Sequence, residues 1–470
     1  MSAGLRTASL FAAMAALFVV VGELQSWSLS LAILNLCLIS AVMSLGVNIQ
    51  WGYGGLLNVG IMGFAALGGL AAVLVSSRPV PAGWQAGGGG VVLALAIGGL
   101  AVGAVLWCLR RLRGRRRAIA AVLLGVAGYF AARQVFLPAV AAIESVNPSA
   151  QGNLGGLGLP ILLSWVVGGA FAAAAAWLVG KVALGLRSDY LAIATLGISE
   201  IVVAVLKNED WLTRGVKNVA GLPRPVPYEV DLQRSERFRA LAEDWGMSVV
   251  ELSSLFVKLC YASLFAAVLL VVLFLSERAL KSPWGRMMRA IRDNEVSAEA
   301  MGQDVKGRHL QVFVLGSAVV GVAGAMLTTL DGQFTPGSYQ PLRFTFLIWA
   351  MVIVGGSGNN WGAVLGGFVV WFFWVEAEPI GLWAMELATS GMDPGSPLRA
   401  HLLDGAAHVR LMAMGAVLLL VLRFTPRGLV PEASAPRAPR GASGGRAAPG
   451  AGTAGRADAP KGPARADTAP

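Results

Sequence analysis

The chain has 470 residues, of which 56% are hydrophobic and 13% are charged, and its formal net charge is +11 at pH 7. Soluble domains carry about 25% charged residues, so this composition excludes an ordinary water-soluble fold. The positive charge does not indicate nucleic-acid binding, because the arginines gather between apolar blocks, where membrane proteins place their cytoplasmic loops. The composition predicts an integral membrane protein.

Apolar blocks follow one another along the chain, and most are close to the ~20 residues that cross a bilayer as a helix. They predict an all-α polytopic membrane protein with about 10–12 transmembrane helices in one domain, residues 1–430. The block Ala8 to Val21 is followed by Glu23 rather than by a small-residue cleavage site, which favours a retained helix over a signal peptide. We place the blocks at residues 7–22, 31–49, 55–75, 91–109, 118–137, 161–180, 190–206, 255–276, 310–330, 343–356, 361–377 and 405–424.

The basic segments set the topology of these blocks. If the N-terminus is cytoplasmic, every fourth crossing brings a basic segment to the cytoplasm: residues 110–117, then 278–309, then the chain beyond Arg423. This count treats the blocks on the two sides of residues 355–362 as separate helices. It predicts a multi-pass inner-membrane protein with both termini in the cytoplasm.

Two loops and a tail interrupt the apolar pattern. Residues 207–254 form a polar loop on the periplasmic side, and residues 277–309 form a cytoplasmic loop. Residues 431–470 are rich in Ala, Pro, Gly and Arg and cannot build a core, so we expect a disordered cytoplasmic tail. The tail has either no specific role or a weak attraction to anionic lipid.

The cytoplasmic loop contains a short amphipathic pattern. At 100° per residue one arc is apolar and the opposite side carries arginines and carboxylates. Pro283 stands before the helix and Gly302 supplies its stop. Such a helix lies on lipid or docks into a protein groove, and the interleaved carboxylates favour a protein groove. The apolar arc consists of Met287, Ala290, Ile291, Ala298 and Met301.

This segment resembles the coupling loop of bacterial ABC-importer permeases, with Glu299-Ala300-Met301-Gly302 in place of a Glu-Ala-Ala–Gly signature. Five segments in order are similar to the branched-chain amino acid permeases: residues 54–60, 188–197, 285–302, 354–362 and 423–429. Three regions depart from that pattern. They are residues 213–218, where a Gly-Gly-x-Asn-Gly turn is expected, residues 76–117, and the tail.

The resemblance implies a type II ABC-importer permease bundle that is not itself an enzyme and binds no cofactor. The chain contains no Gly-x-x-x-x-Gly-Lys-Ser/Thr, so ATP would be bound by partner subunits. The implied partners are two ABC ATPase subunits, a second paralogous permease, a periplasmic solute-binding protein and membrane lipid. The implied ATPase-coupling residues are Gly285, Arg286, Arg289, Ile291, Arg292, Glu295, Ala298, Glu299, Ala300, Met301 and Gly302.

Polar groups inside apolar blocks are candidates for the translocation pathway. Glu200, beside Thr195, either faces a polar cavity or pairs with a neighbouring helix. Asn48 and Asn58 flank a glycine-rich break whose unwound backbone could meet a zwitterionic ligand, or they satisfy local turns.

Small residues at four-residue spacing, Gly358, Gly362 and Gly366, predict close helix packing, with a dimer interface or pathway lining as the alternative. The three histidines and three cysteines show no metal-ligand or disulfide spacing, and no metal site is expected.

Three functions compete on these observations. The first is a permease subunit that translocates branched-chain amino acids, or alternatively urea, amides or other amino acids, with energy from partner ATPases. An ion-coupled secondary transporter would need several intramembrane carboxylates, and Glu200 is nearly alone. An intramembrane enzyme would need a catalytic motif, and none is present.

Overall fold

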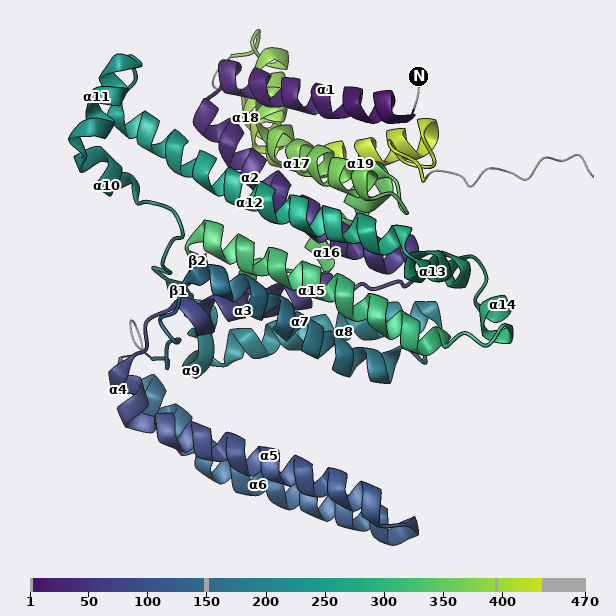
Figure 1. Cartoon of the computed structure of the whole chain (residues 1–470). Helices are drawn as coiled ribbons and strands as arrows, with labels where there is room; N and C mark the ends of the chain where they lie inside the picture. Colours follow the sequence, from purple (N-terminus) through teal and green to yellow (C-terminus); the bar gives the residue numbers. More distant parts are fainter. Residues whose placement is uncertain (1–2, 148–151, 394–395, 433–470) are drawn as a thin grey trace, which may run out of the picture. The chain divides into compact units, whose positions relative to one another are not determined.

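The computed structural model describes residues 3–147, 152–393 and 396–432, and these residues are almost entirely helical (Figure 1). The described strands, β1 (Val219–Ala220) and β2 (Gln333–Phe334), pair antiparallel with Val219 opposite Phe334. The predicted tail lies outside the described residues, except for Pro431 and Glu432.

Nine helical spans among the described residues are long and apolar enough to cross a membrane. A bent pair, α18 with α19, and two shorter apolar helices, α3 and α16, complete the set. Each predicted apolar block coincides with a helix over most of its length, which confirms the all-α polytopic fold, although residues 55–60 of the third block are not helical. The long spans are α1 (Ala3–Leu24), α2 (Trp27–Val47) with η1 (Asn48–Tyr53), α4 (Pro81–Gly83) with η2 (Trp84–Gly88) and α5 (Gly89–Arg111), α6 (Gly114–Val146), α7 (Ile161–Ala183), α8 (Ser188–Asn208), α12 (Val249–Lys281), α15 (Val305–Asp331) and α17 (Asn360–Ala388).

The shorter elements cap and connect these spans. Seven residues separate η1 from α3, and α16 is followed by a glycine turn that leads into α17. Because α16 and α17 are separate helices that pack on each other, treating their two blocks as two was correct. The connecting elements are α3 (Ile61–Ser76), α9 (Asp210–Thr213), η3 (Gly215–Lys217), α10 (Glu229–Arg234), α11 (Glu236–Asp244), α13 (Pro283–Asp293), α14 (Glu295–Ala300), η4 (Pro336–Ser338), α16 (Pro341–Gly355), α18 (Pro397–Asp404) and α19 (Ala406–Phe424).

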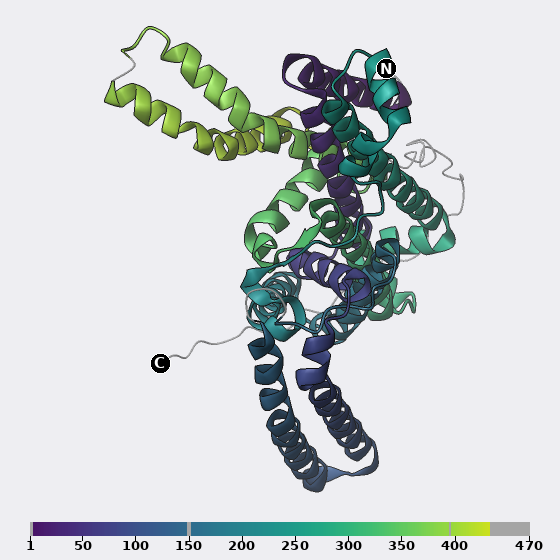
Figure 2. The same ribbon diagram turned by 90° about the vertical axis from the view of Figure 1, so that its left-hand side faces the viewer.

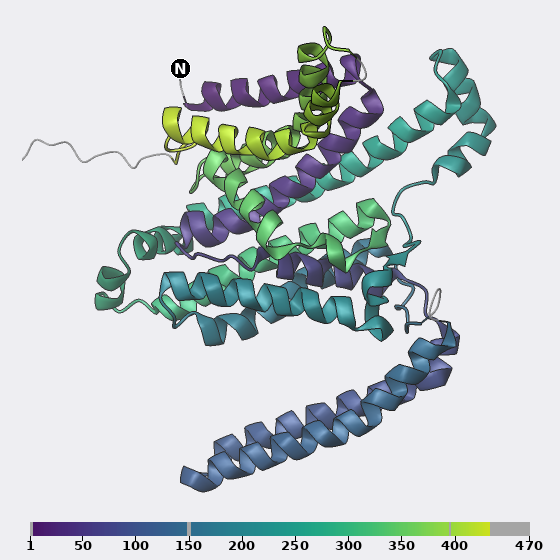
Figure 3. The same ribbon diagram turned by 180° about the vertical axis from the view of Figure 1, so that it is seen from behind.

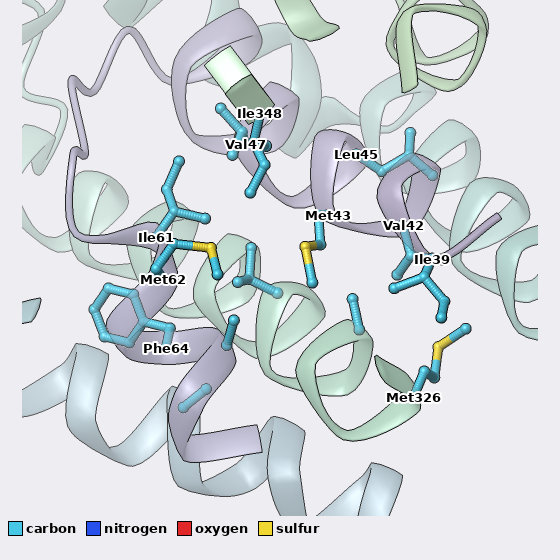
Figure 4. Packing of buried hydrophobic residues seen from close by; sticks show 14 of the residues in the cluster. Ile39, Val42, Met43, Leu45, Val47, Ile61, Met62, Phe64, Met326 and Ile348 are labelled. Atoms are coloured by element: carbon cyan, nitrogen blue, oxygen red, sulfur yellow. The ribbon is translucent and has the colours of Figure 1, made fainter. Parts of the chain in front are cut away.

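Helices α2, α3, α7, α15, α16 and α17 form the most buried part of the protein, which we call the central bundle. Small residues allow its backbones to meet, because lipid supplies no hydrophobic force between helices. A Cβ on Gly68 would overlap the carbonyl of Gly321, and one on Gly324 would overlap that of Ala65. Figure 4 shows the apolar side chains that fill the space between α2, α3 and α15.

Helices α5 and α6 pack mainly on each other and form a hairpin beside the central bundle (Figures 1 and 2). In the most apolar 18-residue stretch of the span that contains α5, 17% of the residues are buried, and in that of α6 0% are buried. The corresponding stretch of α2 with η1 is 78% buried. A small cluster around Ile143 joins the base of the hairpin to residues near Leu154. The hairpin thus presents most of its apolar surface outward.

The three basic segments come together at one end of the bundle, which we call the basic end. Figures 1 and 3 show there the turn between α5 and α6, the pair α13–α14, and the end of α19. The opposite end carries α9, α10 and α11. The three basic segments thus share one end of the bundle, as the topology count requires, and the side of the membrane that this end faces stays a prediction.

The loop between α8 and α12 is folded against the opposite end. Arg214 and Asn218 adopt left-handed backbone conformations (φ 56° and 61°), at the position where a glycine-rich turn was expected. A hollow of about 750 Å³ lies beside this loop and is lined by Arg78, Asn153 and Arg224 among others.

Candidate coupling site and polar junction

The amphipathic segment of the loop 277–309, the coupling loop, folds as two helices, α13 and α14. The prediction of a single helix was therefore wrong. Asn294 separates the helices with an extended backbone (φ −157°), and its side chain accepts a hydrogen bond from the backbone N–H of Ser297 at 2.9 Å. Pro283 is the first residue of α13 rather than a residue before it.

The break changes which residues face the protein. Within the projected apolar arc Ile291 and Ala298 are buried against this chain itself and Met287 is half-buried, but Ala290 and Met301 are exposed. Met288 is fully buried instead. The extended backbone at Asn294 resets the helical phase, so residues on its two sides do not share one 100° series. Met288 precedes this break and is buried because α13 turns the face of Gly285, Met288 and Ile291 inward.

The inner face of α13 requires a small residue at its start. A Cβ on Gly285 would overlap the backbone of Leu280 at the end of α12. Arg289 donates a long hydrogen bond from Nη2 to the carbonyl of Leu280 (3.4 Å), and Arg286 donates a similar one to Lys281 (3.4 Å). These contacts hold α13 against the end of α12.

Helix α14 presents an exposed surface at the basic end. Val296 is 77% exposed and Met301 is 73% exposed, beside the exposed carboxylates of Glu295 and Glu299 and the exposed Ala300. The sequence pattern did not single out Val296, because it falls outside the projected arc.

Gly302 ends α14 with a left-handed backbone (φ +81°), as predicted for a C-terminal stop. The Gly302 N–H donates to the Glu299 carbonyl (2.9 Å), and the Gln303 N–H donates to the Ala298 carbonyl (3.1 Å). These bonds satisfy carbonyls that the helix end would leave unpaired.

Arg292 connects the coupling loop to the break after α2. Its Nη1 donates to the carbonyl of Gly52 in η1 and forms an ion pair with Glu432 (3.1 Å), and its Nη2 forms one with Asp293 (3.1 Å). Burial lowers the pKa of Arg292, but hydrogen bonds and charge attraction from Glu432 and Asp293 outweigh it, so the pKa is raised. The guanidinium therefore stays charged at every physiological pH.

Asn48 joins the break after α2 to the turn between α16 and α17. Its Nδ2 donates to Oδ1 of Asn360 (3.1 Å), and its Oδ1 accepts from the backbone N–H of Gly358 (2.9 Å). Asn360 in turn donates to Oε1 of Glu277 at the end of α12 (3.0 Å). Thus α12, which leads into the coupling loop, bonds to the start of α17 and is connected through Asn360 to the break after α2.

We call this connected set the polar junction. Its members lie on five different parts of the chain. The sequence analysis named Asn48, Gly358 and Arg292 as candidate site residues, and it did not name the other members. No local pattern marks these partners, which are 83 to 312 residues away along the chain. The polar junction consists of Asn48, Gly52, Glu277, Arg292, Gly358, Asn360 and Glu432.

Asn58 belongs to a second buried network around Gln50. Its Nδ2 donates to Oε1 of Gln50 (2.9 Å), and its Oδ1 accepts from the N–H of Gly60 (2.9 Å). Gln50 donates to the Phe313 carbonyl and to the Ser317 hydroxyl, both at 2.9 Å. Both candidate asparagines thus use their amides within the protein, and a role in translocation stays a prediction for them.

The two candidates on α8 face different surroundings. Thr195 is buried, and its hydroxyl accepts from the N–H of Val59 at 3.1 Å. Glu200 is exposed and lines a shallow hollow of about 570 Å³ with Lys207 and Arg343. Within the described residues Glu200 forms no ion pair, so neither alternative for it is decided.

The small residues of α17 pack within the chain. A Cβ on Gly366 would overlap the carbonyl of Met351, and one on Gly362 would lie 2.8 Å from that of Gly355. Gly358 has a positive φ (+79°) in the turn. Helix packing is therefore the observed role of Gly362 and Gly366, whereas the prediction of helix packing was wrong for Gly358, which lies in the turn between α16 and α17. The described residues contain no group of three or more His, Cys, Asp or Glu side chains that could hold a metal ion.

Comparison with known proteins supplies the family. The pattern of the family described as "Branched-chain amino acid transport system / permease component" matches residues 135–422. The chain is 26% identical over 269 residues to the high-affinity branched-chain amino acid transport system permease protein LivM of Escherichia coli (strain K12), with 56% of each chain covered. It is 25% identical over 398 residues to the probable branched-chain amino acid transport permease protein LivM of Methanocaldococcus jannaschii, covering 83% of this chain and 90% of that one.

A shorter match, 32% identical over 110 residues, links it to the probable branched-chain amino acid transport permease protein LivH of the same archaeon and covers 23% of this chain and 34% of that one. The match spans about half the length of the Escherichia coli relative, and no solved structure matches the chain. On the family match, this multi-pass membrane protein belongs to the permease-component family of branched-chain amino acid transport systems.

Proposed function

We propose that the chain is the transmembrane permease subunit of an ATP-binding-cassette importer and translocates branched-chain amino acids delivered by a periplasmic binding protein. The observation that carries the proposal is the bond from Arg292 to the Gly52 carbonyl, which ties the exposed coupling loop to a break inside the bundle. A partner that moves α13 and α14 would pull on this break directly. The family match supports the same function.

The exposed surface of α14 is the proposed contact with the ATPase. It offers the apolar Val296 and Met301 flanked by Glu295 and Glu299, a pattern suited to a groove with an apolar floor and a basic rim. Two ATPase subunits hydrolyse ATP in this proposal, and the chain itself performs no catalysis. A second, paralogous permease completes the membrane part.

In the proposed orientation the basic end faces the cytoplasm of a bacterial inner membrane. The arginine-rich turn of α5–α6, the coupling loop and the end of α19 then share the side that attracts positive charge. The loop between α8 and α12 faces the periplasm, where the hollow near Arg78 and Arg224 would meet the binding protein.

Reconstitution of the complex purified from native membranes tests this function. Proteoliposomes should accumulate L-leucine in their lumen only when ATP is enclosed there, on the side that the ATPases face. Vanadate enclosed with the ATP should abolish this uptake. Uptake that resists vanadate but collapses with an uncoupler would instead indicate an ion-coupled secondary transporter.

The substrate itself needs a competition experiment. Excess valine and isoleucine should block uptake of labelled leucine, and urea or short amides should not. Transport of urea without competition by leucine would support the alternative substrate class. Identification of the co-purifying subunits by mass spectrometry would show whether two ATPases and a second permease are present.

A further inference from the structure

A cavity of about 230 Å³ lies within the central bundle, away from the polar junction. Typical pockets for drug-sized ligands begin at about 300 Å³, so this cavity suits a small metabolite. Its walls come from α2, α3, α15, α16, α17 and η4. Figure 4 labels four of the lining side chains: Ile39 and Met43 on α2, Met62 on α3 and Ile348 on α16.

The walls of the cavity are mostly apolar. On α2 the lining residues recur at i, i+3 and i+7, which places them on one helical face. Two methionines contribute flexible, polarisable side chains that adapt to ligands of slightly different shape. The apolar lining consists of Leu36, Ile39, Met43, Met62, Leu327, Phe344 and Ile348.

Four polar groups also line the cavity: Ser40, Asp331, Ser338 and Trp371. Ser40 is 5% exposed, and the indole N–H of Trp371 is shielded from solvent. Asp331 and Ser338 are exposed and mark the mouth of the cavity. Among the described residues, none of these four side chains has a hydrogen-bond or ion-pair partner.

These unused groups have a distinct chemistry. Asp331 supplies one carboxylate for a cation, and Ser40, Ser338 and Trp371 supply neutral N–H and O–H donors. The lining contains no arginine or lysine. An ammonium group can pair with Asp331 while a carboxylate accepts from the neutral donors, and an aliphatic side chain meets the apolar wall.

We propose that this cavity is an intramembrane subsite for an aliphatic α-amino acid of leucine size, on the path from the periplasmic side. The proposal rests on the proposed import function and adds a binding place for the substrate within the permease. Asp331 and Ser338 receive the zwitterion at the mouth, and Ile348 limits the size of the side chain. Polar ligands such as urea or glutamine do not match the apolar wall.

Photo-crosslinking of the assembled complex tests the subsite without any transport step. The probe is photo-leucine, a diazirine analogue of leucine, and the labelled peptides are identified by mass spectrometry. We expect labels on the peptides that contain Ser40 to Met43 and Phe344 to Ile348. Excess L-leucine should suppress them and excess L-glutamate should not. Labels confined to other helices, or labels that leucine does not suppress, would overturn the proposal.

A side-chain series then tests the assignment of Ile348. Ile348→Ala should shift relative uptake from valine and leucine toward phenylalanine by about 10-fold, because a few methylene groups in an apolar pocket change selectivity by that order. Ile201→Ala is the matched control, since Ile201 is 63% exposed on α8. An unchanged selectivity ratio in Ile348→Ala would contradict the subsite.

A second pair of variants, one in the cavity and one control, tests the carboxylate of Asp331. Asp331→Asn should lower leucine uptake at least 10-fold, with ATPase stimulation by the loaded binding protein retained, whereas Asp244→Asn on exposed α11 should not change it. Failure of the subsite and of the import function remain distinguishable. ATP-dependent leucine uptake without cavity labelling rejects the subsite alone, and cavity labelling without ATP-dependent uptake rejects the import function alone.

Discussion

The central bundle and the α5–α6 hairpin are almost equally apolar, yet the helices of the bundle are closely packed and buried, whereas those of the hairpin are mostly exposed. The mean hydropathy of the most apolar 18-residue stretch is 2.1 for α2 with η1 and 2.5 for the span that contains α5. The first of these stretches is 78% buried and the second is 17% buried. In the bundle, glycines meet backbone carbonyls, whereas several hairpin glycines have no neighbour within 4 Å.

This contrast separates two uses of an apolar helix in lipid. In the bundle small residues bring backbones together and leave room for buried amide networks such as that of Gln50 and Asn58. In the hairpin the large side chains face outward. Hydropathy marks both as membrane spans, but only close packing marks the part that holds the polar junction and the cavity.

The largest expected effect comes from filling a backbone contact in the bundle. Gly324→Leu should prevent folding, because even a Cβ would overlap the carbonyl of Ala65. Gly99→Leu is the matched control in the hairpin, where an added Cβ would meet no atom of another part of the chain within 4 Å. Size-exclusion of the detergent-solubilised protein should show a monodisperse peak for Gly99→Leu alone. Equal recovery of both variants would break the comparison.

The second-largest effect is expected from a substitution at the end of α14. Gly302→Arg should abolish transport while the protein still reaches the membrane, because the new side chain intrudes on the proposed ATPase contact. Left-handed backbone costs a non-glycine residue roughly 1–2 kcal/mol, so strain must be controlled. Gly114→Arg provides that control, since Gly114 has φ +61° and open surroundings in the hairpin turn. Comparable loss of uptake in both variants would attribute the effect to strain.

The polar junction should show a smaller effect. Arg292→Ala should lower uptake per assembled complex about 10-fold and destabilise the protein by about 1–3 kcal/mol, because the Gly52 carbonyl and Glu432 lose their partner. Uptake assays and thermal unfolding measure the two effects. Arg113→Ala, on the exposed hairpin turn, should change neither. Normal coupling in Arg292→Ala would show that α13 is not linked to the break through this residue.

The smallest effect is expected within the hairpin. Phe130 is 53% exposed, so Phe130→Ala should change the free energy of unfolding by no more than about 0.5 kcal/mol and leave uptake unchanged. Thermal unfolding in detergent and in nanodiscs checks this. If the variant loses a co-purifying permease, the hairpin is a subunit interface, and its outward apolar surface serves a protein rather than lipid.

Some parts of the site follow from short stretches of sequence. The stop at Gly302, the break at Gly55 and the turn at Gly358 need backbone conformations that glycine adopts readily, and all three have positive φ. Local rules located the stop at Gly302 and the break at Gly55, whereas Gly358 was expected to pack within a helix and lies instead in the turn between α16 and α17. Val296 was missed for a local reason, because it follows the extended residue Asn294, which shifts the helical phase. Met288 was missed because it lies on the buried face of α13, which only the packing of that helix reveals.

The sequence by itself determined that the chain crosses a membrane many times, where its helices lie, which loop is amphipathic and where its backbone breaks. These properties depend on hydropathy and on single residues. Only the tertiary structure decided that Arg292 reaches Gly52, that Asn48 bridges two breaks, that Glu200 faces outward and that four polar groups share a cavity. A helix in lipid is apolar on every side, so its sequence does not reveal which face turns inward until the neighbouring helices are in place.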